Sequence, residues 1–274
     1  MWRWSITIRR AGGMDDAKAK INVSVAVITK NEERLIGRCI DSVQWSDDII
    51  VVDGMSADRT AEIARSKGAR VAEHKFTGSF ADDRNLGTEM ARNEWVLHID
   101  ADDVVTEGFR RRMAEALAKG GKVDVYKFRR RNFFLGHSMD HGGFHHYIPN
   151  LVRKGAVRYE GAVHEVPVYR GAEGTIEADI DHHPFDSIQQ FIDRQSRYAG
   201  IAAGQMLETE GVMDDKAIRK CIIAKSFKVF LKSYVKKQGY RDGLYGLVFA
   251  VLFSFINFLK WAKYWELVRV KREA

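Results

Sequence analysis

The chain has 274 residues, of which 45% are hydrophobic and 30% are charged, and its formal net charge is +7. This length and composition indicate a folded protein with one large domain and an appendage. The net charge favours an anionic partner. Because Lys and Arg alternate with aromatic residues near the C-terminus, we expect a membrane surface and no nucleic acid. Cys39 and Cys221 lie far apart in predicted helices, so neither a disulfide framework nor a zinc site is expected.

Residues 1–20 contain no apolar stretch long enough for a signal peptide, and we expect them to form a loose leader. Short runs rich in Val and Ile then alternate with amphipathic helical patterns. The runs cover residues 23–29, 49–53, 69–73 and 95–100, and the helical patterns cover residues 32–43, 58–67, 82–92 and 107–119. This alternation predicts βαβ units around a largely parallel sheet. Thr106 is the expected N-cap of the last of these helices.

After Gly120 and Gly121 the alternation changes. Strand-like segments cover residues 123–130, 148–153 and 157–169, helical patterns cover residues 185–208 and 213–237, and a last segment begins at Arg241. The three strand-like segments are joined by loops, which predicts a mixed second half of the sheet. The predicted fold class is therefore α/β, with a Rossmann-like mixed sheet flanked by helices and a C-terminal helical extension.

Each of the first strand-like runs ends in a polar or acidic residue, and the last ends in the DADD run Asp100–Asp103. Ligands of open α/β sheets lie just beyond the carboxyl ends of the strands, so Thr29, Asp53 and Asp100 should converge on one crevice. An acidic crevice repels nucleotide phosphates unless a divalent cation lies between them, and Mg²⁺ or Mn²⁺ prefers such oxygen ligands. Three carboxylates within four residues also repel one another without a cation or basic partners. The DADD run therefore predicts a metal ion.

Four ordered segments carry a family resemblance: VSVAVITKNEERLIGRCIDSV, IIVVDGMSADRT, DDRNLG and WVLHIDADD. Together they resemble the inverting family 2 glycosyltransferases of the GT-A fold. The later segments YEGAVHE, DHHPFDSIQQFIDRQSRYA and KSYVKKQGYRDGLYG resemble a narrower bacterial branch that includes lipopolysaccharide inner-core β-glucosyltransferases. The resemblance implies a nucleotide-sugar-binding half at residues 21–120, an acceptor-side half at residues 121–184 and a helical region at residues 185–274.

The resemblance also implies where a uracil-diphosphate donor binds. Thr29, Asn31 and Glu32 follow the first strand and would hold the base and ribose. Asp53 would hydrogen-bond the uracil edge, and Asp100 would contact the ribose. The alternative for the loop is an ordinary helix start, and the alternative for Asp53 is a turn that caps the next helix.

Further residues are implied for the phosphates, the sugar and the cation. Asp102 would bind the metal that bridges both phosphates, and Asp103 would support this site or bind the sugar. Arg84 and Asn85 match a family segment near the donor phosphates and sugar, with a solvated helix face as the alternative.

An inverting transfer needs one base to deprotonate the attacking acceptor hydroxyl. We assign Glu165 as that base, because the branch resemblance places a His-Glu pair there, and Glu160 and Asp140 are the alternatives. Family members often take a third metal ligand from a late histidine, for which His164 and His182 are candidates. The alternative for each histidine is a packed or hydrogen-bonded role.

The segment His137–Tyr147 holds four histidines in eleven residues. Their spacing matches no common zinc pattern, and two glycines indicate a mobile loop. We interpret it as an acceptor-side flap, with an ordinary surface loop as the alternative.

The C-terminal stretch Leu244–Leu259 contains sixteen uncharged residues, whereas a membrane span needs about 20. Lysines and aromatic residues flank it on both sides. This pattern favours insertion into an anionic membrane interface without crossing it. The alternatives are a helix packed on the domain or in a homodimer, and a true membrane span.

The sequence therefore predicts a metal-dependent, inverting glycosyltransferase that is peripheral on the cytoplasmic, inner face of the cell membrane. Its expected partners are a nucleotide-sugar donor, with UDP-hexose as the main candidate, and a lipid-linked saccharide acceptor such as lipopolysaccharide core. A polyprenyl-phosphate glycosyltransferase and a catalytically silent GT-A binding module are the alternatives, and the intact pair of Asp100 and Asp102 argues against the silent module. A nucleotidyltransferase would usually carry a glycine-rich loop after its first strand, where this chain has TKNEE.

Overall fold

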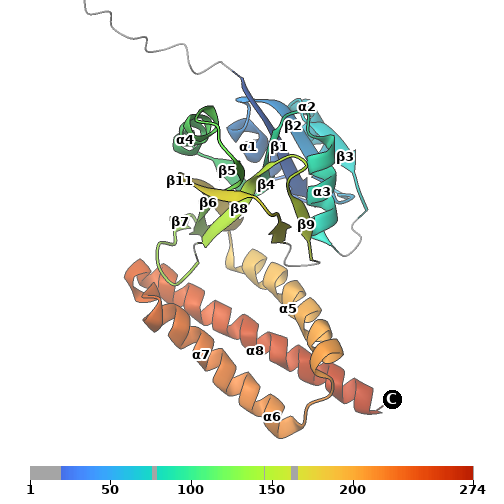
Figure 1. Ribbon diagram of the computed structural model, residues 1–274. Coiled ribbons are helices and arrows are strands. Elements are labelled where there is room, and N and C mark those ends of the chain that lie inside the picture. Colours follow the sequence, from blue (N-terminus) through green and yellow to red (C-terminus); the bar gives the residue numbers. More distant parts are fainter. Residues whose placement is uncertain (1–19, 76–78, 145, 162–165, 274) are drawn as a thin grey trace, which may run out of the picture. The chain divides into compact units, whose positions relative to one another are not determined.

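A computed structural model describes residues 20–75, 79–144, 146–161 and 166–273 (Figure 1). The chain divides into two compact units, each assembled from separate segments. The first unit takes its residues from 1–101, 114–126 and 150–174, and the second unit takes its residues from 102–113, 127–149 and 175–274. These units are structural and do not test the predicted functional halves.

The first unit is built on the predicted parallel strands. These are β1 (Ile21–Thr29), β2 (Ser46–Asp53), β3 (Arg70–Glu73) and β4 (Trp95–Asp100), in the order β3-β2-β1-β4. The Val and Ile side chains of β2 and β4, and most of those of β1, are buried, as the apolar runs predict. Thr29 pairs with Asp53, and Ile28 pairs with Asp100. The register therefore brings the ends of three strands to one edge, as predicted.

Helices of the first unit cover this sheet. They are α1 (Ile36–Ser42), α2 (Thr60–Ser66) and α3 (Phe80–Met90), and α4 (Glu107–Ala118) has residues in both units. α1 and α2 are shorter than the sequence patterns suggest, whereas α3 has the predicted length and begins two residues earlier. Ala81, Leu86 and Met90 of α3 join a core cluster with residues of β1, β2 and β4. Gly87 permits this contact, because a Cβ atom there would lie 2.9 Å from the Cβ of Ala26. Thr106 caps α4 as predicted, accepting from the Phe109 N–H at 3.1 Å.

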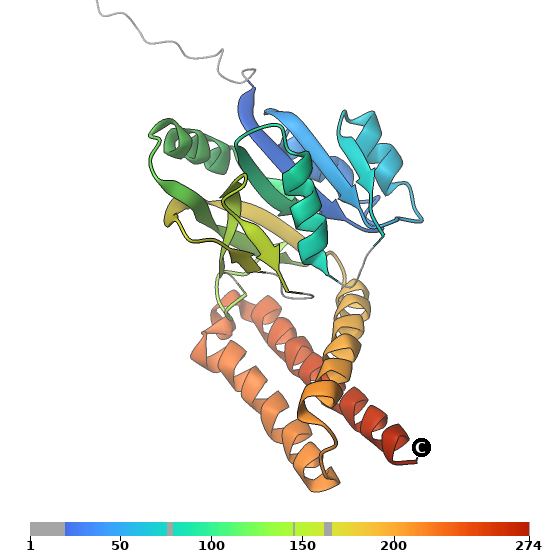
Figure 2. The same ribbon diagram turned by 45° about the vertical axis from the view of Figure 1, so that its right-hand side comes forward.

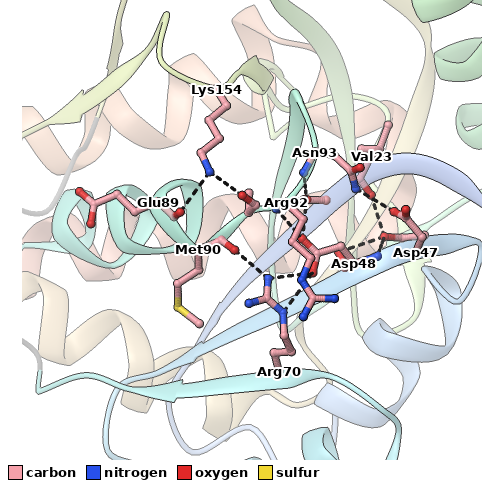
Figure 3. A network of polar contacts seen from close by, with 12 residues as sticks. Val23, Asp47, Asp48, Arg70, Glu89, Met90, Arg92, Asn93 and Lys154 are labelled. Carbon is pink, nitrogen blue, oxygen red and sulfur yellow. Dashed lines mark hydrogen bonds and ion pairs between the residues drawn. The ribbon is translucent and has the colours of Figure 1, made fainter.

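A polar network fastens the amino ends of the parallel strands (Figure 3). The buried carboxylate of Asp48 accepts hydrogen bonds from Ser24 Oγ at 2.6 Å, the Arg92 N–H at 2.9 Å and Arg70 Nη2 at 2.8 Å. Burial alone would raise the pKa of Asp48, but these donors hold it below its ordinary value. Because this network lies at the opposite ends of the strands from Asp53 and Asp100, we assign it a structural role.

The second half of the sheet is mixed, as predicted, but contains strands that the sequence patterns missed. β8 (His146–Arg153) pairs antiparallel with β4, and in the second unit the order is β6-β11-β5. These last strands are β6 (Val123–Phe134), β11 (Ala172–Phe185) and β5 (Asp103–Val105), and β7 (His137–Ser138) pairs with β6. The single strand expected at residues 157–169 is instead an antiparallel pair, β9 (Arg158–Glu160) and β10 (Val166–Val168).

The C-terminal helices belong to the second unit. α5 (Ile188–Glu210) lies along α8 (Gly243–Glu273), which a short 3₁₀ turn, η3 (Gly239–Asp242), precedes (Figures 1 and 2). The predicted helix at residues 213–237 is a helical run with two π-helical segments. It comprises α6 (Asp215–Lys220), η1 (Cys221–Lys225), α7 (Ser226–Phe230) and η2 (Leu231–Lys236). Phe134, Met139, Phe185, Phe191 and Phe249 form a buried cluster that joins these helices to the strands of the same unit.

The histidine-rich segment that follows β7 is anchored on these helices. His141 Nδ1 lies 2.8 Å from Asp242 Oδ1, and the His141 N–H donates to the other oxygen of Asp242 at 3.0 Å. His137 stacks on Tyr245 with ring centroids 4.4 Å apart. Residues 137–142 therefore contact partners about a hundred residues further along the chain, and the mobility of the segment stays a prediction. The role of an acceptor-side flap stays a prediction.

Candidate active site

Thr29 and Asp53 form the floor of the predicted uridine site, at paired positions on β1 and β2. Thr29 Oγ1 is buried and has no hydrogen-bond partner among the described residues. Both carboxylate oxygens of the buried Asp53 accept from Ser56, Oδ1 from the hydroxyl at 2.6 Å and Oδ2 from the N–H at 2.9 Å. Asp53 therefore shapes the turn after β2, and its bond to uracil stays a prediction. The unpaired hydroxyl of Thr29 is consistent with a ligand there.

The loop after β1 is locked to the loop after β2. Asn31 has a left-handed backbone with φ of 56°. Its N–H donates to Ser56 Oγ at 2.8 Å, and its Oδ1 accepts from the Ala57 N–H at 2.8 Å. The Glu32 N–H donates to Thr60 Oγ1 at 2.8 Å. The structure thus brings Thr29, Asn31 and Glu32 together with the Asp53 loop, as one preorganised edge of the first unit.

Arg84 and Asn85 lie on α3 and have different partners. Arg84 Nη2 donates to Asp100 Oδ1 at 2.9 Å, and its guanidinium lies 5.7 Å from the centroid of the Tyr159 ring. The side-chain amide of Asn85 pairs with both backbone groups of Tyr159, each at 2.9 Å. Arg84 therefore compensates the charge of Asp100. Asn85 fastens α3 to β9, and its contact with the donor stays a prediction.

Asp102 is buried in the second unit between an arginine and a histidine. Its Oδ2 accepts from Arg194 Nη1 at 2.8 Å, and its Oδ1 lies 3.3 Å from His182 Nε2. Burial alone would raise the pKa of Asp102, but His182, Arg194 and Arg130 together hold it far below its ordinary value. Asp102 is therefore ionised at any physiological pH.

Asn132 fixes the orientation of the His182 ring. Its side-chain NH₂ donates to the Phe144 carbonyl, so its Oδ1 faces His182 Nδ1, which must carry a proton to donate to it. His182 Nε2 then points to Asp102 and can serve as a metal ligand once it is deprotonated. Asp103, the residue that follows Asp102, is buried and accepts from Arg130 Nε at 2.9 Å. Its predicted sugar contact is untested.

These side chains suit a divalent cation. Asp100 precedes Asp102 by two residues, so the peptide chain holds their Cα atoms within about 7 Å. Asp102 and His182, both of the second unit, belong to a group of side chains that could hold a metal ion. Mn²⁺ accepts carboxylate and imidazole ligands alike, and Mg²⁺ prefers the carboxylates. The predicted ligand His164 and the predicted base Glu165 lie outside the described residues.

The sequence patterns missed three residues of this site: Arg194, Arg130 and Asn132. Basic partners were expected for the DADD run in general, because its carboxylates repel one another. No local pattern identifies which arginines these are, since they lie on β6 and α5, far along the chain. Asn132 follows three arginines and carries no motif of its own.

The chain is similar to known glycosyltransferases. The chain is 25% identical over 265 residues to the lipopolysaccharide core biosynthesis glycosyltransferase LpsC of Rhizobium meliloti, covering 90% of this chain and 93% of LpsC. It is 23% identical over 259 residues to an uncharacterized glycosyltransferase of Rickettsia typhi, covering 89% of this chain and 87% of that protein. Among solved structures, S. aureus TarS matches with a TM-score of 0.44 and 16% identity, covering 82% of this chain and 46% of TarS.

The family model "Glycosyl transferase family 2" matches residues 24–173, which is more than half of the chain. This match spans β1 to β4, the DADD run and β9. It agrees with the family that the sequence motifs indicate. The chain belongs to glycosyl transferase family 2.

Proposed function

We propose that this protein is an inverting, metal-dependent glycosyltransferase that moves a hexose from UDP-hexose to a lipid-linked glycan such as lipopolysaccharide core. The observation that carries the proposal is the buried, ionised Asp102 facing His182 Nε2, next to the acidic end of β4. A carboxylate and an imidazole so placed form the start of a cation site. The likeness to LpsC over 90% of the chain supports the acceptor class.

Each side chain has a separate task in this proposal. Asp102 and His182 hold Mn²⁺ or Mg²⁺, which neutralises the charge on the departing nucleoside diphosphate when it is bound. Thr29 and Asp53 bind the uridine, with Asn31 and Glu32 shaping the loop. Glu165 accepts the proton of the acceptor hydroxyl, with Glu160 and Asp140 as alternatives.

Donor turnover tests this proposal directly. Purified protein should hydrolyse one nucleotide sugar of a panel slowly in the absence of acceptor, in the presence of Mn²⁺ and not of EDTA. We expect a UDP-hexose to be that substrate, and release of UDP measures the reaction. A panel that yields no turnover and no UDP binding would favour the silent binding module. Transfer to polyprenyl phosphate, and not to a glycan, would favour the alternative enzyme.

The C-terminal helices support a peripheral membrane location at the cytoplasmic face. Gly239–Glu273 is long and apolar enough to cross a membrane by length and composition alone, and 17% of its most apolar window is buried. However, Phe249, Trp261, Tyr264 and Val268 of α8 are buried against protein. One face of α8 is therefore occupied, which favours a helix that lies on the membrane over one that crosses it.

The helical run from α6 to η2, residues 215–236, supplies a second apolar surface. Ile223, Phe227, Leu231 and Val235 recur every four residues and are 66%, 60%, 40% and 54% exposed. We call these four residues the exposed stripe. Lysines at 225, 228, 232 and 236 follow the same run. Apolar side chains with lysines beside them are suited to an anionic lipid surface.

Vesicle binding tests this surface. Full-length protein should sediment with vesicles that contain anionic lipid, because each lysine near the surface contributes about 1 kcal/mol and apolar burial adds to this. Replacing Phe227 and Leu231 by Ser should weaken binding roughly 30-fold, while the fold persists because both side chains are exposed. Val212→Ser, an exposed apolar position outside the stripe, is the matched control. Protein that stays free of anionic vesicles would point to a protein-covered or homodimer surface.

A further inference from the structure

Arg194 contacts the same carboxylate, that of Asp102, that would hold the cation. It comes from α5, a 23-residue helix that begins with Ser187 accepting from the Gln190 N–H at 3.1 Å. Its Nη1 lies 2.8 Å from Asp102 Oδ2, while Oδ1 faces His182. Both carboxylate oxygens therefore have a partner in the second unit without any metal ion.

A guanidinium on one oxygen of a buried carboxylate disfavours a divalent cation on the other oxygen, because both partners are positive and little solvent screens them. Asp102 needs a positive partner, since an unpaired buried carboxylate is strongly destabilising. Arg194 meets this need in the free protein. Its side chain is 25% exposed, so solvent reaches part of it, and its guanidinium lies 5.9 Å from the Phe185 ring centroid within its own unit.

We propose that Arg194 is a placeholder for the metal ion: it neutralises Asp102 in the free protein, and moves to the diphosphate of the donor when the metal–nucleotide complex binds. The inference rests on the proposed function. A guanidinium matches phosphate oxygens with two parallel hydrogen bonds, so the exchange replaces one charged pair with another. The site is thereby kept electrically balanced both before and after donor binding.

This exchange has a signature that a structural arginine lacks. In the absence of nucleotide, Arg194 competes with the cation for Asp102. Once nucleotide is present, Arg194 contacts the diphosphate and strengthens nucleotide binding. Removing its charge should therefore strengthen the binding of metal alone and weaken the binding of nucleotide. A residue that only stabilises the fold would shift both affinities in the same direction, or neither.

The test uses full-length Arg194→Gln, with Arg197→Gln on the exposed side of α5 as the matched control. Free Mn²⁺, measured by electron paramagnetic resonance, should show roughly tenfold tighter binding to Arg194→Gln than to the wild type. Calorimetry with UDP at saturating Mn²⁺ should show roughly tenfold weaker binding. Arg197→Gln should match the wild type in both measurements.

Thermal unfolding gives a further readout if Arg194→Gln is poorly stable. Mn²⁺ should raise its melting temperature more than it raises that of the wild type, because the cation replaces the missing partner of Asp102. Arg194→Lys, which keeps the charge but not the paired hydrogen bonds, should bind Mn²⁺ like the wild type and UDP more weakly. Affinities for Mn²⁺ and UDP that fall together, or do not change, in Arg194→Gln would overturn the placeholder. Wild-type protein that binds Mn²⁺ but never UDP would instead overturn the proposed function.

Discussion

Asp102→Asn should abolish metal-dependent binding of UDP and lower donor turnover by roughly 10³-fold, because a bound cation contributes several kcal/mol to the stabilisation of the leaving group. Asparagine has the same size but no charge. It leaves His182 and Arg194 without the anion that both contact at 3.3 and 2.8 Å. Calorimetry with UDP, with and without Mn²⁺, measures the binding, and UDP release measures turnover.

Asp181→Asn is the matched control for this variant. Asp181 precedes His182 on β11 and pairs with Arg131 at 2.7 Å, away from Asp102. Its charge loss should leave UDP binding and turnover near the wild-type values. If Asp102→Asn bound UDP as tightly as the wild type, and equally well with Mn²⁺ and with EDTA, the prediction that the DADD run holds a metal required for UDP binding would be wrong.

Gly246→Ala should destabilise the second unit by about 3 kcal/mol or more, the range of a severe steric conflict in a packed region. A Cβ atom at this position of α8 would lie 1.8 Å from the carbonyl oxygen of Gly239 and 2.8 Å from its carbon. These are backbone atoms of η3, so no flexible side chain can move aside. Urea unfolding followed by tryptophan fluorescence would report the change, because Trp261 is buried in the same unit.

Gly204→Ala is the opposite case on a neighbouring helix. Apart from the neighbouring backbone of α5 itself, no atom of the described residues lies within 4 Å of a Cβ built at Gly204. Replacing a helical glycine by alanine in open space should stabilise the protein by up to about 1 kcal/mol. Equal unfolding midpoints for the two alanine variants would show that η3 and α8 do not pack as closely as described.

The parallel strands could be predicted from the sequence because their signal is local. Val and Ile runs of β1, β2 and β4 are apolar on both faces, which only a buried strand requires. β11 is not an apolar run, and it contains Gly174 and two aspartates, Asp179 and Asp181, which are residue types uncommon in strands. It lies between β6 and β5 in the sheet, and its Ile176 and Ile180 are buried there.

The candidate site likewise has residues that local sequence patterns predict and residues that they do not. The chain positions of Thr29, Asp53 and Asp100 follow from the strands that end at them, so their convergence could be predicted. The partners of the acidic residues depend on tertiary packing. Arg194 reaches Asp102 across 92 positions of sequence, and His141 reaches Asp242 across 101. No pattern of neighbouring residues encodes contacts of that range.

The two π-helical segments have a geometric consequence for the exposed stripe. In an α-helix, a step of four residues overshoots a full turn by about 40°, so residues spaced by four wind around the axis. A π-helical turn takes about 4.4 residues, so the same step falls short of a full turn. η1 and η2 alternate with α-helical turns along residues 221–236, and the opposite rotations partly cancel. The stripe from Ile223 to Val235 is thereby straightened, and a straight row of side chains can meet a flat bilayer along its full length, where a winding row would touch it at one point.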